Sequence, residues 1–348
     1  MRHALKRSVR RFENSGTLLP LFSNRRKDGD WGYVSSAINQ TREHLGLQPD
    51  PVAAGCCKPG QAEPDYLLWS RIRLLLREPF LEFWGVFILV LFGDSVCAQT
   101  YLSEKEYGAR LTTSQNRWSA GIMFGIYVAG DSGAYLNPAV TLTNCIFRGV
   151  PLARFPIYLA AQLLGGLAAA AVVYAQYLPA IDHYEGPGIR TVPPVQTSSA
   201  KLFASFPADF VPTGSQFVAE FLGNFATTFC IFALRDENGG VFTMALFFLN
   251  FVLISCFGWQ TGSPINPGRD FSGRAFMSMA GYPNETWTTG NYFFWVPTFV
   301  PFIACIFGAW MYDVFIYTGP SPVNTPYLGL GQLWWNIRRK LRKKEKDE

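Results

Sequence analysis

Two Asn-Pro dipeptides are the most chemically distinctive feature of this sequence. Asn137-Pro138-Ala139 lies in SGAYLNPAVT, and Asn266-Pro267-Gly268 lies in TGSPINPGRDF. Because Asn is a good N-cap and Pro suits the first turn, each dipeptide predicts a short helix, over about 137–147 and 266–279. Each helix start carries about half a positive charge, and the Asn amides are free to donate to a passing oxygen. These sites predict recognition of neutral oxygen-bearing solutes and repulsion of cations.

Two ionisable residues directly after the second dipeptide extend this chemistry. The planar guanidinium of Arg269 donates several hydrogen bonds and repels cations. The alternative for Arg269 is a surface arginine that reaches a lipid phosphate. Asp270 could hold the Arg269 segment by hydrogen bonds or an ion pair, or it could simply suit the positive end of the helix.

Three more carboxylates fall in apolar segments, where an ionisable residue has a functional or structural partner by default. Glu82 and Glu220 occupy matching places, in LEFWGVF and AEFLGNF. We expect each to accept backbone N–H groups from the Asn-Pro loop of its own half. A proton relay is the alternative, but none of the three histidines lies in an apolar segment. Asp94 has no counterpart, and the sequence assigns it no role.

Six apolar segments must position these residues. The segments without any Asp, Glu, Lys or Arg are 155–178, 241–258 and 292–312. Since roughly 20 apolar residues cross a bilayer as a helix, they predict transmembrane helices. The weaker spans, which contain one or two acids, are 80–96, 118–136 and 214–234. With 49% hydrophobic and 16% charged residues among 348, the chain is predicted to be an all-α membrane protein rather than a soluble one.

The chain also repeats itself. Each half contains a Glu-Phe-x-Gly sequence and, further on, an Asn-Pro dipeptide. Three spans per half is an odd number, so the second copy must be inverted in the membrane. Irregular backbone at membrane depth is tolerated where it lines a watery cavity, so the two short helices should meet end to end there. The predicted fold has six transmembrane helices and two half-helices in an inverted 3+3 repeat.

Charge predicts the orientation and the domain organisation. Lys and Arg number 13 in residues 1–77 and 7 in residues 319–348, which places both ends in the cytoplasm. We expect a largely disordered tail over 1–76, a channel domain over 77–318 and a basic tail over 319–348. That last tail is either simply solvated or binds anionic lipid. Asn284, in Asn-Glu-Thr, then falls outside as a candidate glycosylation acceptor.

The two Asn-Pro segments, together with IYLAAQLLGG from Ile157 and VPTFVPFIACIFGA from Val296, resemble the major intrinsic protein family of aquaporins and aquaglyceroporins. The resemblance covers about residues 78–316. It implies a pore in each subunit, assembly as a homotetramer, passive conduction of small neutral solutes and no cofactor. Gly268 departs from the family pattern, which usually has Ala there.

The resemblance also assigns four selectivity-filter positions. These are Trp118, Ile254, Ser263 and Arg269. Trp118 is similar to the Trp of glycerol facilitators, with a tryptophan of the membrane interface as the alternative. Ile254 stands where water-selective members have His, and Ser263 where glycerol facilitators often have Phe. The filter is therefore wider and more polar, or another aromatic residue fills the space. Asp270 resembles the residue that follows the filter arginine in aquaglyceroporins.

The predicted function is a passive channel for water and small neutral solutes, above all glycerol. The alternatives are a pore mainly for water, hydrogen peroxide or ammonia, or a secondary transporter built on an inverted repeat. An ion channel is opposed by Arg269 and the two positive helix ends. The apolar segments show no nucleophile–base pair or metal-ligand set that would indicate an enzyme. The expected partners are a lipid bilayer, by default the plasma membrane, and no nucleic acid.

Overall fold

The computed structural model describes residues 68–103, 111–236, 242–325 and 328, and most of these residues lie in helices. The α-helices are α3 (Leu68–Leu75), α4 (Arg77–Leu102), α5 (Leu111–Ala129), α6 (Pro138–Phe147), α7 (Phe155–Glu185), α8 (Thr213–Asp236), α9 (Phe242–Thr261), α10 (Pro267–Met279), α11 (Glu285–Tyr292) and α12 (Trp295–Phe315). Four short 3₁₀ turns join them: η2 (Gly130–Ser132), η3 (Leu152–Arg154), η4 (Ser199–Leu202) and η5 (Pro322–Asn324). Most of both predicted tails lies outside the described residues.

Six long helices correspond to the six predicted spans. Five of them, α4, α7, α8, α9 and α12, are long and apolar enough to cross a membrane, and α5 has 19 residues. The chain is thus a multi-pass, all-helical membrane protein. The two half-helices are also present: α6 begins directly after Asn137, and α10 begins directly after Asn266.

Two predicted spans include residues that lie outside the corresponding helices. The second span was expected over 118–136, but α5 ends at Ala129 and the chain turns at Gly133, whose φ of 97° no helix accepts. The sixth span was expected from Tyr292, but α12 begins at Trp295. Non-helical dihedrals at Thr289, Gly290 and Asn291 break the chain before it. In both places, apolar residues that hydropathy assigns to a span belong to a connecting segment instead. The first segment leads into α6, and the second lies between α10 and α12.

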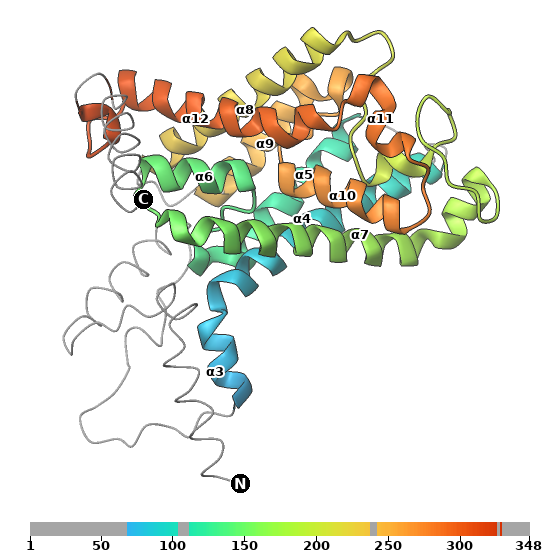
Figure 1. Cartoon of the computed structure of the whole chain (residues 1–348), viewed down its shortest axis with the longest axis horizontal. Coiled ribbons are helices and arrows are strands. Elements are labelled where there is room, and N and C mark those ends of the chain that lie inside the picture. The colour runs from blue at the N-terminus through green and yellow to red at the C-terminus, as the bar shows by residue number, and fades with distance from the viewer. Residues whose placement is uncertain (1–67, 104–110, 237–241, 326–327, 329–348) are drawn as a thin grey trace, which may run out of the picture.

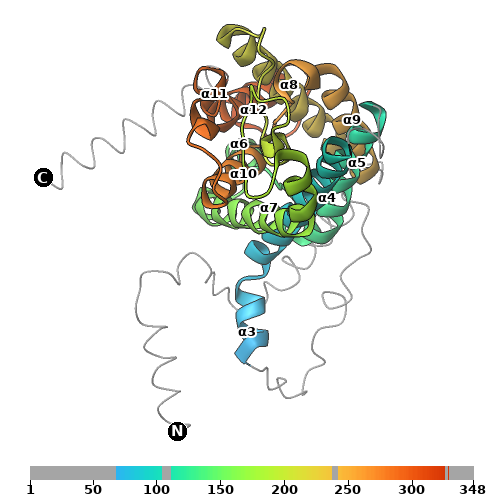
Figure 2. The same cartoon turned by 90° about the vertical axis from the view of Figure 1, so that its right-hand side faces the viewer.

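The packing follows the inverted repeat. In the first half α4 packs on α5 and α7, and in the second half α8 packs on α9 and α12. The half-helices are exchanged between the halves, because α10 lies against α7 and α6 lies against α12. Figure 1 shows α6 and α10 in line along the long axis, and Figure 2 shows both of them between α12 and α7. Helix α3 projects from this bundle.

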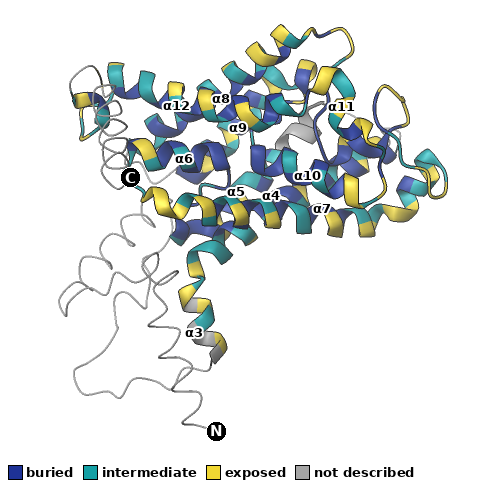
Figure 3. Ribbon diagram, in the orientation of Figure 1, coloured by how far each residue is buried: buried dark blue, intermediate teal, exposed yellow. Residues whose placement is uncertain are grey.

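Burial is arranged for a membrane rather than for water. Buried residues line the contacts between helices, and the outer faces of the bundle expose many residues (Figure 3). Large apolar side chains are prominent among them: Phe248 is 58% exposed, Ile303 59% and Phe299 57%. Exposed apolar side chains of this kind suit contact with lipid tails. The five described cysteines are free, and two of them, Cys97 and Cys305, are buried.

Two glycines bring the long helices of each half into close contact. A Cβ added to Gly165 of α7 would lie 2.3 Å from the backbone oxygen of Phe83 on α4. A Cβ added to Gly308 of α12 would lie 2.5 Å from the backbone oxygen of Phe225 on α8. Small residues at such crossings let backbones approach and gain van der Waals contact, which drives helix association in membranes.

We therefore expect Gly165→Ala and Gly308→Ala each to destabilise the fold by about 1–3 kcal/mol, the usual cost of overpacking. The measurement is thermal unfolding of the purified protein in detergent. Gly214→Ala is the matched control, since an added Cβ there meets nothing within 4 Å. Unfolding of Gly165→Ala at the temperature of the control would contradict this account of the packing.

Candidate functional site

The two loops that precede the half-helices have the same unusual backbone. Ala134 and Leu136 have φ of 48° and 53°, and Ser263 and Ile265 have φ of 46° and 52°. Residues with a Cβ disfavour this left-handed region, at a cost of roughly 1–2 kcal/mol each. The surrounding structure must therefore hold both loops in place.

Glu82 holds the first loop. Its Oε1 accepts hydrogen bonds from the backbone N–H of Tyr135 at 3.0 Å and from the Ser132 hydroxyl at 2.6 Å. Its Oε2 accepts from the backbone N–H of Leu136 at 2.9 Å and from the Gln162 amide at 2.7 Å. Glu82 is fully buried, so its carboxylate has lost its hydrogen bonds to water. The four donors replace those hydrogen bonds and offset the free-energy cost of burial. The backbone contacts expected from the sequence are present.

Glu220 holds the second loop in the same way, with fewer and longer contacts. Its Oε2 accepts from the backbone N–H of Ile265 at 3.4 Å, and its Oε1 accepts from the Thr261 hydroxyl at 3.0 Å. Asn224 donates to Oε2 at 3.4 Å. The inverted repeat thus duplicates the strained loop together with its carboxylate support.

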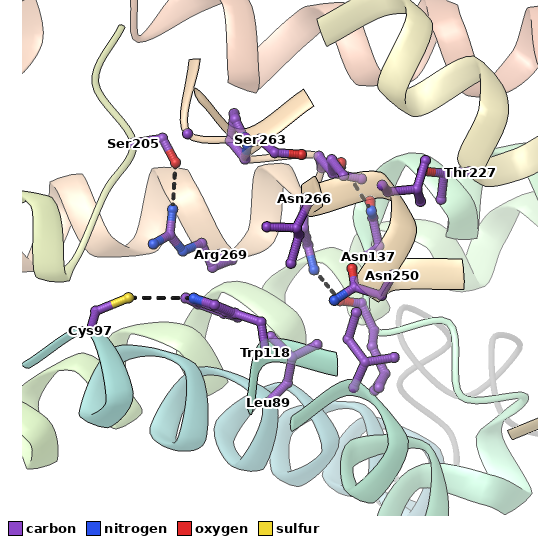
Figure 4. A pocket seen from close by; sticks show the side chains of 18 of the residues that line it. Leu89, Cys97, Trp118, Asn137, Ser205, Thr227, Asn250, Ser263, Asn266 and Arg269 are labelled. Atoms are coloured by element: carbon purple, nitrogen blue, oxygen red, sulfur yellow. Dashed lines mark hydrogen bonds between the residues drawn. The ribbon is translucent and has the colours of Figure 1, made fainter. Parts of the chain in front are cut away.

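The two half-helices begin where these loops meet. The side-chain oxygen of Asn137 accepts from the backbone N–H of Ala139, and that of Asn266 accepts from the backbone N–H of Gly268, each at 2.9 Å. The predicted N-caps are therefore confirmed. One N–H of each amide, which the sequence left free, is committed to the opposite loop. Asn266 donates to the Leu136 carbonyl at 2.7 Å, and Asn137 donates to the Ile265 carbonyl at 3.2 Å (Figure 4).

Each amide nitrogen thus donates one N–H to the opposite loop and has a second N–H outside that bond. The two half-helix starts also touch directly at Gly268. An added Cβ there would lie 3.0 Å from Pro138 Cδ and 3.1 Å from Asn266 Oδ1, so the missing methyl leaves no hole. Pro138 and Pro267 supply the first helical residues, where no backbone N–H is required.

A cavity of about 990 Å³ runs past this junction. Its lining includes Asn137 and Asn266, and it also includes all four residues assigned to the filter from the sequence. Asp94, Glu82 and Glu220 do not line it. Figure 4 shows Trp118 and Arg269 close together on one side of the two Asn residues.

Arg269 and Trp118 lie side by side on the wall of this cavity. The Arg269 guanidinium carbon lies 4.7 Å from the centroid of the Trp118 ring, a cation–π contact. Arg269 Nη1 donates to the Ser205 hydroxyl at 2.8 Å, and the Trp118 indole N–H donates to Cys97 Sγ at 3.4 Å. These contacts place Trp118 on the cavity wall and not among lipid headgroups, and they place Arg269 away from any surface phosphate.

The remaining two assigned positions, Ile254 and Ser263, also line this cavity. Ile254 presents an aliphatic side chain to the cavity, and Ser263 lines it with a buried hydroxyl that has no hydrogen-bond partner among the described residues. Phe206 and Tyr101 are further aromatic residues on the lining. Within the described residues, no group of His, Cys, Asp or Glu could hold a metal ion.

Asp94 proves to be a neighbour of Arg269, which the sequence did not reveal. Its Oδ1 lies 3.8 Å from Arg269 Nη2, and neither of its buried oxygens has a hydrogen-bond partner among the described residues. Asp270 pairs with Arg269 at 3.3 Å and with the buried Arg274 at 2.9 Å, and it accepts the backbone N–H of Ser205 at 2.7 Å. Asp270 therefore makes both the hydrogen bonds and the ion pairs considered for it from the sequence. In this cluster the carboxylates of Asp94 and Asp270 balance the guanidinium groups of Arg269 and Arg274.

Sequence reasoning missed three contributors: Asp94, Ser205 and Arg235. Asp94 was noticed only because it breaks the symmetry between the halves. Ser205 lies in the loop before α8 and offers no motif. Arg235 also lines the cavity and stands in the last turn of α8, at the end of an apolar span. A charged residue at the end of a span was the signal that could have indicated it.

The fold and the site define a membrane protein with a pore between two inverted halves. The sequence profile of the major intrinsic protein family matches residues 69–312, and the chain belongs to that family.

Its relatives include Aquaglyceroporin-9 of Botryotinia fuckeliana, 51% identical over 278 residues, a match that covers 78% of this chain and 61% of the relative. The chain thus spans less than two thirds of that relative's length. Probable aquaglyceroporin-2 of Gibberella zeae is 50% identical over 275 residues, covering 78% of this chain and 81% of the relative. The X-ray structure of the aquaglyceroporin from Plasmodium falciparum superimposes with a TM-score of 0.61 at 25% identity, covering 69% of this chain and 96% of that chain.

Removal of the carboxylate that holds the first loop should unfold the site. We expect Glu82→Ala to lower the free energy of unfolding by about 3 kcal/mol or more, because buried donors lose their acceptor. Thermal unfolding in detergent measures this. Asp209→Ala is the control, because Asp209 is an exposed acid and an exposed carboxylate contributes about 1 kcal/mol or less. Equal losses in the two variants would show that Glu82 has no special structural role.

Proposed function

We propose that this protein is a passive channel that conducts glycerol and water across a membrane. The observation that carries the proposal is the single cavity that passes the two Asn residues and the Arg269–Trp118 pair. The names of the two fungal relatives and of the solved structure, all aquaglyceroporins, support it. No step of such conduction needs a cofactor.

The proposed filter suits a polyol in particular. Glycerol has one edge of hydroxyl groups and one edge of C–H groups. Arg269 and the unpartnered hydroxyl of Ser263 would serve the first edge, and Trp118 with Ile254 would serve the second. Past the filter, the remaining amide N–H groups of Asn137 and Asn266 would donate to solute oxygens at the junction.

The alternatives fit the site less well. A pore for water alone usually relies on a narrow filter with a histidine, and this chain has Ile254 in that place. A secondary transporter would need an ionisable site that changes its access. Glu82 and Glu220 are committed to the loops, and Asp94 is committed to Arg269 outside the cavity lining. Hydrogen peroxide and ammonia are small enough to share the proposed pathway.

The proposal extends to assembly and location. Each subunit contains a complete pore, and we propose that four subunits assemble in the plasma membrane with both termini in the cytoplasm. The channel domain would be residues 77–318, between tails over 1–76 and 319–348. The mouth beyond the end of α6 would then face the cytoplasm, and the mouth beyond the end of α10 would face outward. The exposed Asn284, just after α10, would be accessible there for glycosylation.

Osmotic challenge of proteoliposomes tests the main proposal. In stopped-flow light scattering we expect fast shrinkage in a sorbitol gradient, because water leaves, and fast reswelling only in a glycerol gradient. Empty liposomes are the control. Fast shrinkage without reswelling would replace the proposal with a water-selective pore, and acceleration in neither gradient would overturn both.

A second prediction concerns the support of Arg269. In Asp94→Asn the guanidinium loses the charge that holds it toward α4, so it should lean into the cavity. We expect the ratio of glycerol to water permeability to fall about fivefold, as expected for about 1 kcal/mol at a filter. Asp209→Asn, which changes an exposed acid, is the control. An unchanged ratio would show that Asp94 does not position Arg269.

A further inference from the structure

A second arginine lies on the cavity wall, at the mouth opposite Arg269. Arg235 is in the last turn of α8 and lines the same cavity. With a rise of 1.5 Å per residue, it lies roughly 22 Å along α8 from Glu220, which supports the loop before α10. Arg235 instead contacts the loop and helix of the first half. It is thus separated from Arg269 by the junction of the half-helices.

Four contacts hold the Arg235 guanidinium in place. Nη1 donates to Asn144 Oδ1 on α6 at 2.8 Å, and Nη2 donates to the Gly133 carbonyl at 3.1 Å. The rings of Tyr135 and Phe242 lie at 5.2 and 5.5 Å from the guanidinium carbon, and both residues line the cavity too. An arginine beside aromatic rings thus occurs at both ends of the pore. Because guanidinium has five N–H donors, some remain for a solute.

The two arginines differ in how their charge is compensated. Arg269 has two carboxylates within 4 Å, those of Asp94 and Asp270. The ion pairs found among the described residues include none with Arg235, whose hydrogen-bond acceptors are a neutral amide and a backbone carbonyl. Its neighbour Asp236 pairs with Arg148 at 3.7 Å. The positive charge of Arg235 is therefore the less compensated of the two.

We propose that Arg235, Tyr135 and Phe242 form a second selectivity site, at the mouth beyond α6, that accepts neutral hydroxyl-bearing solutes and adds a second charge barrier against small monovalent cations. This rests on the channel function proposed above. A fixed charge in a mouth with low-dielectric walls acts strongly on an entering ion and has little effect on a neutral one. Neutral solutes meet hydrogen-bond donors and ring faces at this site, as they do at Arg269.

The test compares Arg235→Gln, which removes the charge, with Arg235→Lys, which keeps it. The protein is reconstituted in planar bilayers, and the current carried by methylammonium chloride at pH 6 is measured per unit of water permeability. We expect Arg235→Gln to raise this current about tenfold or more, and Arg235→Lys to stay near the wild type. The ratio of glycerol to water permeability should change less than about twofold, because the solute is neutral.

Arg190→Gln is the matched control, since Arg190 pairs with Asp182 and does not line the cavity. Cation current in Arg235→Gln equal to that of the wild type would overturn the inference, and so would equal leaks through the Gln and Lys variants. Arg235→Met serves as the charge-free variant if the Gln variant does not assemble. Wild-type protein that passes water but no glycerol would contradict the channel function proposed for glycerol, while the cation comparison would still report on Arg235.

Discussion

The buried carboxylates of Glu82 and Glu220 are the interactions on which the pore depends. Each accepts the N–H of a residue held in the left-handed region, Leu136 or Ile265, just before a half-helix begins. Without an acceptor at that depth, these loops would carry both backbone strain and unsatisfied donors inside a membrane. The positions of both Asn caps follow from these two contacts, and Arg269 stands one turn beyond the second cap. The free-energy cost of burying the two carboxylates is thus offset by the hydrogen bonds that they accept from the loops beside the cavity.

The two halves share a backbone plan but differ in their charges. Both have the strained loop, the Asn cap and a glycine at the crossing of their long helices. Only the second half places a filter arginine after its cap, and only there do Asp94 and Asp270 surround it. Only in the first half does the loop before the half-helix contact Arg235, through the Gly133 carbonyl. An inverted repeat explains the scaffold, and the departures from symmetry explain how its two mouths can discriminate among solutes in different ways.

Much of this arrangement could be predicted from the sequence, because its signals are local. Apolar runs as long as a bilayer is thick require spanning helices whatever lies next to them. Asn followed by Pro specifies a helix start, and α6 and α10 begin where this rule places them. An odd number of spans per repeat requires inversion. The limits of the second and sixth spans were misjudged because hydropathy cannot distinguish a lipid-facing helix from an apolar loop folded inside the protein.

Contacts between residues distant in the sequence needed the folded molecule. Asp94 and Arg269 are far apart along the chain, and nothing in either segment indicates that the two side chains meet. The same holds for Asn266 with the Leu136 carbonyl, which commits an amide that the sequence left free. In the sequence, Arg235 is an ordinary arginine at the end of a helix. Only the fold shows that it donates to Asn144 on α6 and to the Gly133 carbonyl. Local patterns specify which elements form, whereas the compensation of a buried charge depends on which helices pack together, and that is a property of the whole fold.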